Sequence, residues 1–368
     1  MLSNIRKTFI LTTVICLLLS GCASSDDRNL TDLNNNDFTV ETTYLSCGML
    51  VVSNEKSGDD KRYGCINENG ELAIPLKYKG LHIYTEDLAR AIKPENETNR
   101  FCYIDKTGAE VITTVNGKDI AYGDIFIDGY AIVSLKGEEG SYVIDKNGKV
   151  CLAPTDEKFY YRKLGGGLFE RYYTANCIDP QGVVDIRGKV KYSGSLKLIM
   201  PTNRFNGFYE VDGDKYGILD NKNYEQVSEP VFLEITPFVD GVAIVASIDG
   251  KVQIIDPNGV CLVDLSKQYK NIDNTRLGEF SNGVTALDFT DDTGSIIIDI
   301  KGNIVAKTDY DEIGSFSDGI AICKKDGKYG YVDSTGAEIL KPVYEWATNI
   351  DNGISFVLNE GKLYRFTR

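Results

Sequence analysis

Side chains that could carry out catalysis are sparse in this sequence. Its one histidine, His82, lies in the strand-like run 81–84, so we expect it to be structural. A metal site with a single histidine would depend on carboxylates, and the sequence has no HExxH motif, no Gly-x-Ser-x-Gly elbow and no P-loop. We therefore predict no catalytic residue, no metal site, no cofactor and no enzymatic activity.

Carboxylates and a glycine triplet leave two further chemical possibilities. The chain has 54 Asp and Glu residues, and two of them from different repeats could form the pair that hydrolyses a glycosidic bond. Their spacing neither requires nor excludes such a pair, so a glycan-acting hydrolase remains an alternative hypothesis. Gly165-Gly166-Gly167 lies between two leucines and favours a degenerate turn over a phosphate cradle.

The amino terminus has the features of a secretory signal peptide. Arg6 and Lys7 give it a basic start, and residues 8–19 form a mostly apolar run. Twelve residues would span only about 18 Å as a helix, which is short of the roughly 30 Å hydrocarbon core of a membrane. A short transmembrane or buried helix is therefore the less favoured interpretation.

The end of this segment carries a specific motif. Leu19, Ser20, Gly21 and Cys22 resemble the lipobox of bacterial lipoproteins, and all four positions match. In that family the cysteine thiol is joined to diacylglycerol, and the chain is cut just before it. The resemblance implies that residues 1–21 are removed and that Cys22 is lipidated. Two or three acyl chains give stable anchoring, so we expect a location on the extracytoplasmic face of the cell membrane. A Gram-negative or a Gram-positive envelope would suit Cys22 equally.

Composition separates a tether from the remaining domain. Residues 22–37 are rich in Ser, Asp and Asn, which predicts a lipidated cysteine followed by a flexible tether. Residues 38–368 are then the folded domain. The formal charge of −14 becomes about −16 without the basic signal peptide. An acidic chain repels phosphate backbones, so nucleic acid is not an expected partner.

Cysteine usage does not point to a metal site. Seven cysteines remain after Cys16 is removed and Cys22 is lipidated, and none is in a CxxC motif. Most lie in apolar strand-like runs, so we expect small buried hydrophobic residues, with one or two disulfides as the alternative.

A repeated motif organises the domain. An acid or amide is followed three residues later by Gly at seven places, and an eighth has Asn instead. The positions are Asn67/Gly70, Asp105/Gly108, Asp145/Gly148, Asp179/Gly182, Asp220/Asn223, Asp256/Gly259, Asp299/Gly302 and Asp333/Gly336. Spacings of 34 to 43 residues indicate a repeat architecture. Asp accepts hydrogen bonds from the backbone two residues on, and Gly adopts positive φ, so we expect eight hairpin turns rather than eight metal ligands.

A second landmark follows in most repeats. Phe-x-x-Gly precedes apolar runs at Phe126, Phe238, Phe280 and Phe316, with a variant at Ile350. The unit therefore predicts three or four short strands in about 38 residues. No amphipathic helix of ten residues or more is expected after the signal peptide.

These units resemble the WG-repeat (KWG-repeat) family. Its unit has an aromatic-Gly pair, Ile-Asp-x-x-Gly, an aliphatic strand with Pro, and a strand led by Phe-x-x-Gly. Residues 328–345 match closely, with Tyr329-Gly330 at the Trp-Gly position, and Tyr63-Gly64 and Tyr216-Gly217 match too. The middle copies lack the pair. The resemblance covers about residues 45–368 and implies β-repeats and surface binding, without implying an activity.

The predicted fold class is all-β, with about eight tandem β-hairpin units in a propeller-like ring or an open β-solenoid. We favour the ring, because a unit of this length has the size of a propeller blade. Residues 48–52 and 361–366 are apolar half-units. They could close a ring by pairing the first and last strands, or cap a solenoid.

The leading hypothesis is a membrane-anchored, non-enzymatic binding or scaffold protein that presents its β-repeat surface to cell-wall glycan or a protein partner. An envelope-assembly lipoprotein scaffold is the first alternative, and the glycan-acting hydrolase is the second. The 22 Tyr residues suit sugars and interfaces, although we expect most of them to pack between repeats. The ligand-binding residues are unknown at this stage.

Overall fold

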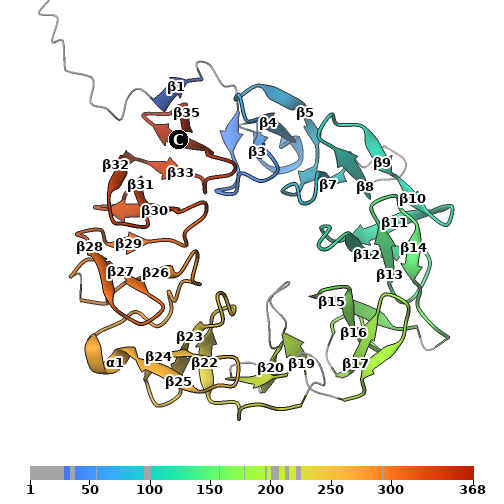
Figure 1. The fold of residues 1–368 in the computed structure, drawn as a ribbon. Coiled ribbons are helices and arrows are strands. Elements are labelled where there is room, and N and C mark those ends of the chain that lie inside the picture. Colours follow the sequence, from blue (N-terminus) through green and yellow to red (C-terminus); the bar gives the residue numbers. More distant parts are fainter. Residues whose placement is uncertain are drawn as a thin grey trace, which may run out of the picture.

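The chain folds into a ring of small antiparallel sheets (Figure 1). The computed structural model describes residues 29–33, 38–54, 56–94, 101–156, 158–177, 179–194, 197–199, 207–211, 215–220, 225–291 and 293–368. Within these ranges, helix is limited to α1 (Leu265–Gln268) and a 3₁₀ turn at Gly58–Asp60. The all-β prediction and the preferred ring are confirmed.

The repeating unit is an antiparallel sheet of about four strands, which we call a blade. Blade 1 is β2 (Thr39–Val40), β3 (Met49–Ser53), β4 (Tyr63–Asn67) and β5 (Leu72–Tyr78). Blade 2 is β6 (Gly80–Leu81), β7 (Leu88–Ile92), β8 (Phe101–Asp105) and β9 (Glu110–Ile112). Blade 3 is β11 (Lys118–Gly123), β12 (Tyr130–Leu135), β13 (Tyr142–Asp145) and β14 (Val150–Leu152), with β10 (Thr114–Val115) paired to β11.

Three more blades follow in chain order. Blade 4 is β15 (Tyr160–Gly165), β16 (Leu168–Tyr172), β17 (Pro180–Asp185) and β18 (Val190–Tyr192). Blade 5 is β19 (Lys197–Ile199), β20 (Gly207–Val211) and β21 (Lys215–Leu219), with a bridge from Leu219 to Gln226. Blade 6 is β22 (Phe232–Ile235), β23 (Ala243–Ser247), β24 (Val252–Ile255) and β25 (Cys261–Asp264).

The last three blades complete the ring. Blade 7 is β26 (Val284–Leu287), β27 (Ile296–Asp299) and β28 (Ile304–Lys307), with a bridge from Ile272 to Phe289. Blade 8 is β29 (Glu312–Ile313), β30 (Ile320–Lys325), β31 (Lys328–Asp333) and β32 (Glu338–Tyr344). Blade 9 is β33 (Trp346–Ala347), β34 (Ile354–Asn359), β35 (Lys362–Thr367) and β1 (Leu30–Asp32).

The described residues thus form nine blades where the turn motifs predict about eight. The eight predicted turn positions are distributed one to each of blades 1 to 8, and Asn223 of blade 5 lies outside the described residues. Blade 9 needs no such turn, because its outer strand β1 comes from the other end of the chain and pairs antiparallel with β35. Figure 1 shows β1 outermost and β33 nearer the centre of the ring.

Ring closure differs from the prediction in the strand that makes it. Residues 48–52 fall in β3, the second strand of blade 1, and the strand that pairs with the carboxyl-terminal β35 is Leu30–Asp32. These three residues belong to the predicted tether 22–37, of which Leu33 also packs against a core shared by blades 1 and 9. Backbone pairing and that contact outweigh the polar composition around them.

The core lies between neighbouring blades, because strand side chains alternate between two faces. In β8, Cys102 and Ile104 pack toward blade 1, whereas Tyr103 packs toward blade 3 against Phe126. The Tyr103 and Phe126 ring centroids are 4.9 Å apart. Landmark residues such as Phe126 and Phe238 are fully buried, and this explains their repetition.

One predicted turn lies six residues away from its predicted place. In blade 4 the hairpin is closed by Asp185 and Gly188, not by Asp179 and Gly182, because the Gly188 N–H donates to the Asp185 carbonyl (2.8 Å). Gly182 instead corresponds to the glycine of the aromatic-Gly pair that begins the repeat unit. A Cβ there would lie 2.2 Å from the Tyr192 carbonyl oxygen, so the close approach of β18 requires glycine.

Candidate functional site

The predicted lipidation motif, Leu19, Ser20, Gly21 and Cys22, lies outside the described residues. Within the described chain, no helix is both long and apolar enough to cross a membrane. The seven cysteines in the described residues are all free thiols, and Cys65, Cys102 and Cys323 are fully buried, as expected for small hydrophobic residues. The expectation is wrong for the other four, because Cys47, Cys151 and Cys177 are half-buried and Cys261 is exposed on the outer strand β25.

Six of the eight repeated acids and amides form hairpin turns, as the sequence predicts. The Asp105 carboxylate accepts hydrogen bonds from the Thr107 hydroxyl (2.6 Å) and from the backbone N–H groups of Thr107 (2.9 Å) and Ala109 (3.0 Å). The Thr107 hydroxyl bond is the largest cause that holds the pKa of Asp105 below its usual value; burial opposes it, and the backbone donors add to the lowering. Equivalent bonds occur at Asn67, Asp145, Asp185, Asp256, Asp299 and Asp333. In the part of the chain that the structure describes, no group of three His, Cys, Asp or Glu side chains is placed to hold a metal ion.

A second set of turns joins neighbouring blades. The turn before β12 has positive φ at both Asp128 (54°) and Gly129 (83°), and in Figure 1 it points toward the centre of the ring. The Gly129 N–H donates to the carboxylate of Glu86 in blade 2 (2.9 Å), and the Asp128 carboxylate accepts from Gly166 in blade 4 (2.8 Å). Gly165-Gly166-Gly167 is therefore the corresponding turn of blade 4, as predicted. The carboxylates of Glu86 and Asp128 therefore each bind a backbone N–H of the following blade and so hold neighbouring blades together.

Several buried charged groups also serve the framework. The Lys163 ammonium lies 3.0 Å from the Asp124 carboxylate and so joins blades 3 and 4. Burial raises the pKa of Asp124, and the Lys163 charge opposes that effect. Asp288 accepts from the Ser295 hydroxyl (2.6 Å) and from the Ile313 N–H of blade 8 (3.2 Å), and its pKa is raised by burial.

The pocket-lining residues gather just before the landmark residue in blades 6 to 9 and in corresponding stretches of blades 1 and 2. We call these stretches the inner-face segments: residues 41–44, 81–83, 234–237, 277–279, 314–315 and 346–349. In blades 1, 2, 6, 8 and 9 the segment follows or includes the first strand, and in blade 7 residues 277–279 precede β26. Three pockets at different blade junctions are lined largely by these segments. Sequence reasoning missed them, although their signal is visible: residue types vary there beside an invariant turn.

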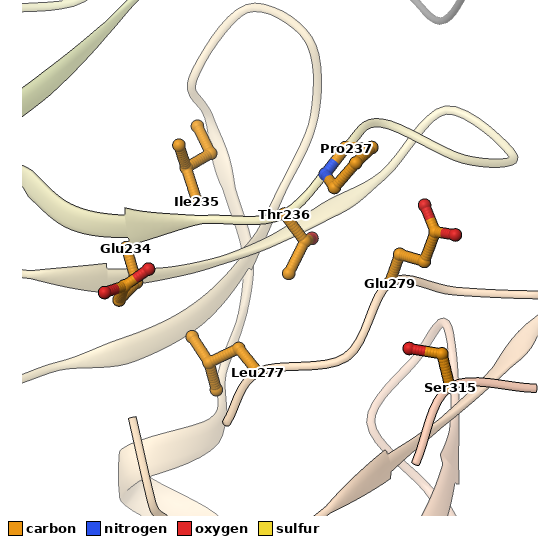
Figure 2. Close-up of a pocket in the computed structure, with 7 residues that line it drawn as sticks. All are labelled: Glu234, Ile235, Thr236, Pro237, Leu277, Glu279 and Ser315. Atoms are coloured by element: carbon orange, nitrogen blue, oxygen red, sulfur yellow. The ribbon is translucent and has the colours of Figure 1, made fainter. Parts of the chain in front are cut away.

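The pocket between blades 6, 7 and 8 contains two carboxylates. It has a volume of about 400 Å³, and Glu234 and Glu279 line it together with Thr236, Leu277 and Ser315. Glutamates from neighbouring blades are what the hydrolase alternative would need. Figure 2 shows them on opposite sides of Thr236. The Thr236 hydroxyl is part of the framework, because it accepts a hydrogen bond from the Ile244 N–H (2.9 Å).

The pocket between blades 1 and 2 contains the single histidine. Its volume is about 410 Å³, and it is lined by Glu41, Tyr63 and His82 among others. Contrary to the structural role expected for it, His82 is exposed, and its ring nitrogen contacts the Arg90 guanidinium. Partial burial, followed by the positive charge of Arg90, lowers the pKa of His82. Arg90 also donates to the Gly123 carbonyl (2.5 Å) and so ties blade 2 to blade 3.

The third pocket lies where the two ends of the chain meet. This seam pocket has a volume of about 230 Å³ and is formed by blades 1, 8 and 9. Its polar lining is Thr43, Tyr44, Ser315, Ser317 and Asn349, and its apolar walls are isoleucines. Unlike the other two pockets, it has no charged side chain in its lining.

Comparison with known proteins identifies the repeat. Residues 63–93, 297–329 and 329–362 match the WG containing repeat. The chain therefore contains WG-containing repeats at these three places, as the sequence predicts. Each matched segment runs from the third strand of one blade to about the second strand of the next, so the sequence repeat crosses the blade boundary. No curated protein matches the chain.

Solved structures give only distant likenesses. The computationally designed Ika8 protein is 12% identical, covering 79% of this chain and 96% of its own, with a TM-score of 0.44. BamB from Moraxella catarrhalis is 13% identical, covering 92% and 98%, with a TM-score of 0.40. A eukaryotic initiation factor is 12% identical, covering 86% and 90%, with a TM-score of 0.49. Likeness at this level says nothing about what this chain binds.

Proposed function

We propose that this chain is a non-enzymatic binding scaffold, lipid-anchored through Cys22 on the extracytoplasmic face of the cell membrane, whose inner face contacts cell-wall glycan or a protein partner. The observation that carries the proposal is the division of labour within each repeat. Turn acids and landmark aromatics make contacts within the framework, whereas the inner-face segments differ in residue type from blade to blade and line the three pockets described above.

The chemistry of these segments favours glycan. Tyr44 is 61% exposed and presents an aromatic ring with a hydroxyl, beside the hydroxyls of Thr43 and Ser315. Flat aromatic faces and hydroxyl groups suit the two faces and the edges of a sugar ring. Pockets at successive blade junctions also suit a polymer better than a single small molecule.

The position of β1 sets how far the ring stands from a lipidated Cys22. Because Leu30 is the first residue of β1, only eight peptide steps separate it from Cys22. Fully extended, these steps span at most about 29 Å. The anchored ring would therefore stay within that distance of the membrane, attached through the outer edge of blade 9.

The test is co-sedimentation of the mature chain, made soluble by Cys22→Ser, with purified cell-wall sacculi. We expect saturable sedimentation that soluble glycan fragments compete away. Tyr44→Ala should weaken it, whereas Tyr173→Ala should not, because Tyr173 is similarly exposed (52%) but lies outside the inner-face segments.

Other outcomes would point to the alternatives. If nothing sediments and a cross-linked pull-down from envelope extract enriches one protein, wall binding is wrong and the envelope-assembly scaffold takes its place. Release of soluble sugar from sacculi, abolished by Glu234→Gln or Glu279→Gln, would contradict the non-enzymatic proposal.

A further inference from the structure

We propose that the seam pocket is a subsite for one uncharged sugar ring of an N-acetylhexosamine glycan, and that its occupation stabilises the closed ring. The inference rests on the proposed function and names its ligand and its consequence. It has three parts: a pocket of suitable size and polarity, hydroxyl groups available to a ligand, and walls supplied by both ends of the chain.

Size and polarity restrict the ligand. At about 230 Å³ the pocket is smaller than the roughly 300–1,000 Å³ of sites for drug-sized ligands, so it suits a single ring. No charged side chain lines it, which disfavours ionic ligands. Ile320 and Ile350 supply apolar walls that a methyl group can contact, and an acetamido substituent carries such a methyl.

The polar groups divide into those that build the pocket and those that face its contents. Asn349 builds it: its Oδ1 accepts from the Leu45 N–H (2.9 Å), and its Nδ2 donates to the Leu45 carbonyl (3.1 Å). Within the described chain, the hydroxyls of Thr43, Tyr44 and Ser315 make no hydrogen bond, so they are available to form hydrogen bonds with a ligand. A sugar ring stacked on Tyr44 would reach the two aliphatic hydroxyls with its own hydroxyl groups.

The pocket spans the seam between the first and last blades. Thr43 and Tyr44 belong to blade 1, whereas Ser315 and Asn349 belong to blades 8 and 9. These walls come together only when the ring is closed. A ligand that contacts both sides binds the closed form better than an opened one, and by linkage it stabilises closure.

The chain contains its own reporter for this event. Its single tryptophan, Trp346, lies in β33 three residues before Asn349 and packs against the core that joins blades 1 and 9. Opening of the seam should therefore change Trp346 fluorescence. Trp346 fluorescence should therefore report both ligand binding and unfolding in urea.

The experiment titrates the full mature chain carrying Cys22→Ser with the trimer of N-acetylglucosamine, using Trp346 fluorescence and calorimetry. We expect saturable binding and a higher urea midpoint with ligand. Tyr44→Ala should weaken binding at least tenfold, and Ser315→Lys should abolish it by filling the pocket with a charged chain. Tyr173→Ala should change it less than twofold. Maltotriose, which lacks acetamido groups, should bind at least tenfold more weakly.

A variant outside the pocket tests the coupling. Leu33→Ala removes a contact at the seam without lining the pocket. It should weaken trimer binding three- to tenfold, and saturating trimer should restore part of its lowered urea midpoint. Unchanged affinity in this variant, with a lowered midpoint, would overturn the coupling.

Failure of this inference is distinguishable from failure of the proposed function. If wild type and Tyr44→Ala sediment equally well with sacculi and neither responds to the trimer, the subsite is wrong and glycan binding lies elsewhere. If the trimer binds as described but sacculi do not bind, the subsite is supported and wall binding is wrong. A trimer response that is equal in wild type and Ser315→Lys would overturn the assignment of the pocket.

Discussion

Replacing Asn349 with Ala should weaken closure of the ring, because its side chain bridges the seam. The side chain makes both of its cross-seam hydrogen bonds to the backbone of one residue, Leu45, at 2.9 and 3.1 Å. The substitution leaves a partly buried N–H and carbonyl without this partner. Such groups cost about 1–3 kcal/mol when unpaired, and access of water to this half-buried site favours the lower part of that range.

The measurement is urea unfolding followed by Trp346 fluorescence and by far-ultraviolet circular dichroism. The matched control is Asn303→Ala, because the Asn303 amide bonds only within its own exposed turn, to the Asp299 carboxylate (3.0 Å). The free energy of unfolding of this control should fall by less than about 0.5 kcal/mol. Equal losses in the two variants would refute the idea that Asn349 holds the seam. A fluorescence midpoint unchanged by Asn349→Ala would refute Trp346 as its reporter.

Three further predictions test the framework and the anchor. Gly336→Ala should destabilise more than Gly327→Ala: both have positive φ, but a Cβ at Gly336 would lie 2.4 Å from the Ala306 Cβ of blade 7, whereas the space at Gly327 is open. Overpacking should lower the free energy of unfolding of Gly336→Ala by about 1–3 kcal/mol more than that of Gly327→Ala, as measured by urea unfolding. Equal decreases in the two variants would contradict close packing at Gly336. The Asp105 carboxylate, whose pKa is lowered, should stabilise the fold above about pH 4 and lose that contribution as pH falls through the lowered pKa. Acid unfolding of Asp105→Asn should therefore be less steep between about pH 4 and pH 2, and an unchanged profile would contradict a role for this ionisation. Cys22→Ser should abolish incorporation of labelled fatty acid and release the chain from membranes, whereas Cys16→Ser should do neither; labelling that persists in Cys22→Ser would exclude the lipobox.

The sequence predicts local geometry well because that geometry depends on neighbours in the chain. An Asp side chain bonds to the backbone two and four residues on, so Asp105 and Asp333 could be assigned to turns without any tertiary contact. In blade 4 the same reasoning assigned the turn to Asp179, although Asp185 is also followed by a glycine three residues later. Only pairing with β18 distinguishes a turn glycine from one that lies against a carbonyl oxygen.

The pockets could not be predicted, because each combines residues from different repeats. Glu234 and Glu279 are 45 positions apart in the sequence, and Tyr44 and Asn349 are separated by 305. What brings them together is the stacking of blade upon blade and, for the seam, the closure of the whole ring. His82 was expected in a strand, but β6 ends at Leu81, and His82 is exposed beside the pocket between blades 1 and 2.

The sequence by itself determined the repeat, the all-β class and the hairpin turns, because each follows from residue types at short, fixed spacing. It also supplied the motif that predicts lipidation of Cys22. The tertiary structure decided the number of blades and the strand that closes the ring, since Leu30–Asp32 is recognised as a strand only through its pairing with β35. It also decided which residues face a ligand, because an inner-face segment becomes a pocket wall only when neighbouring blades pack beside it.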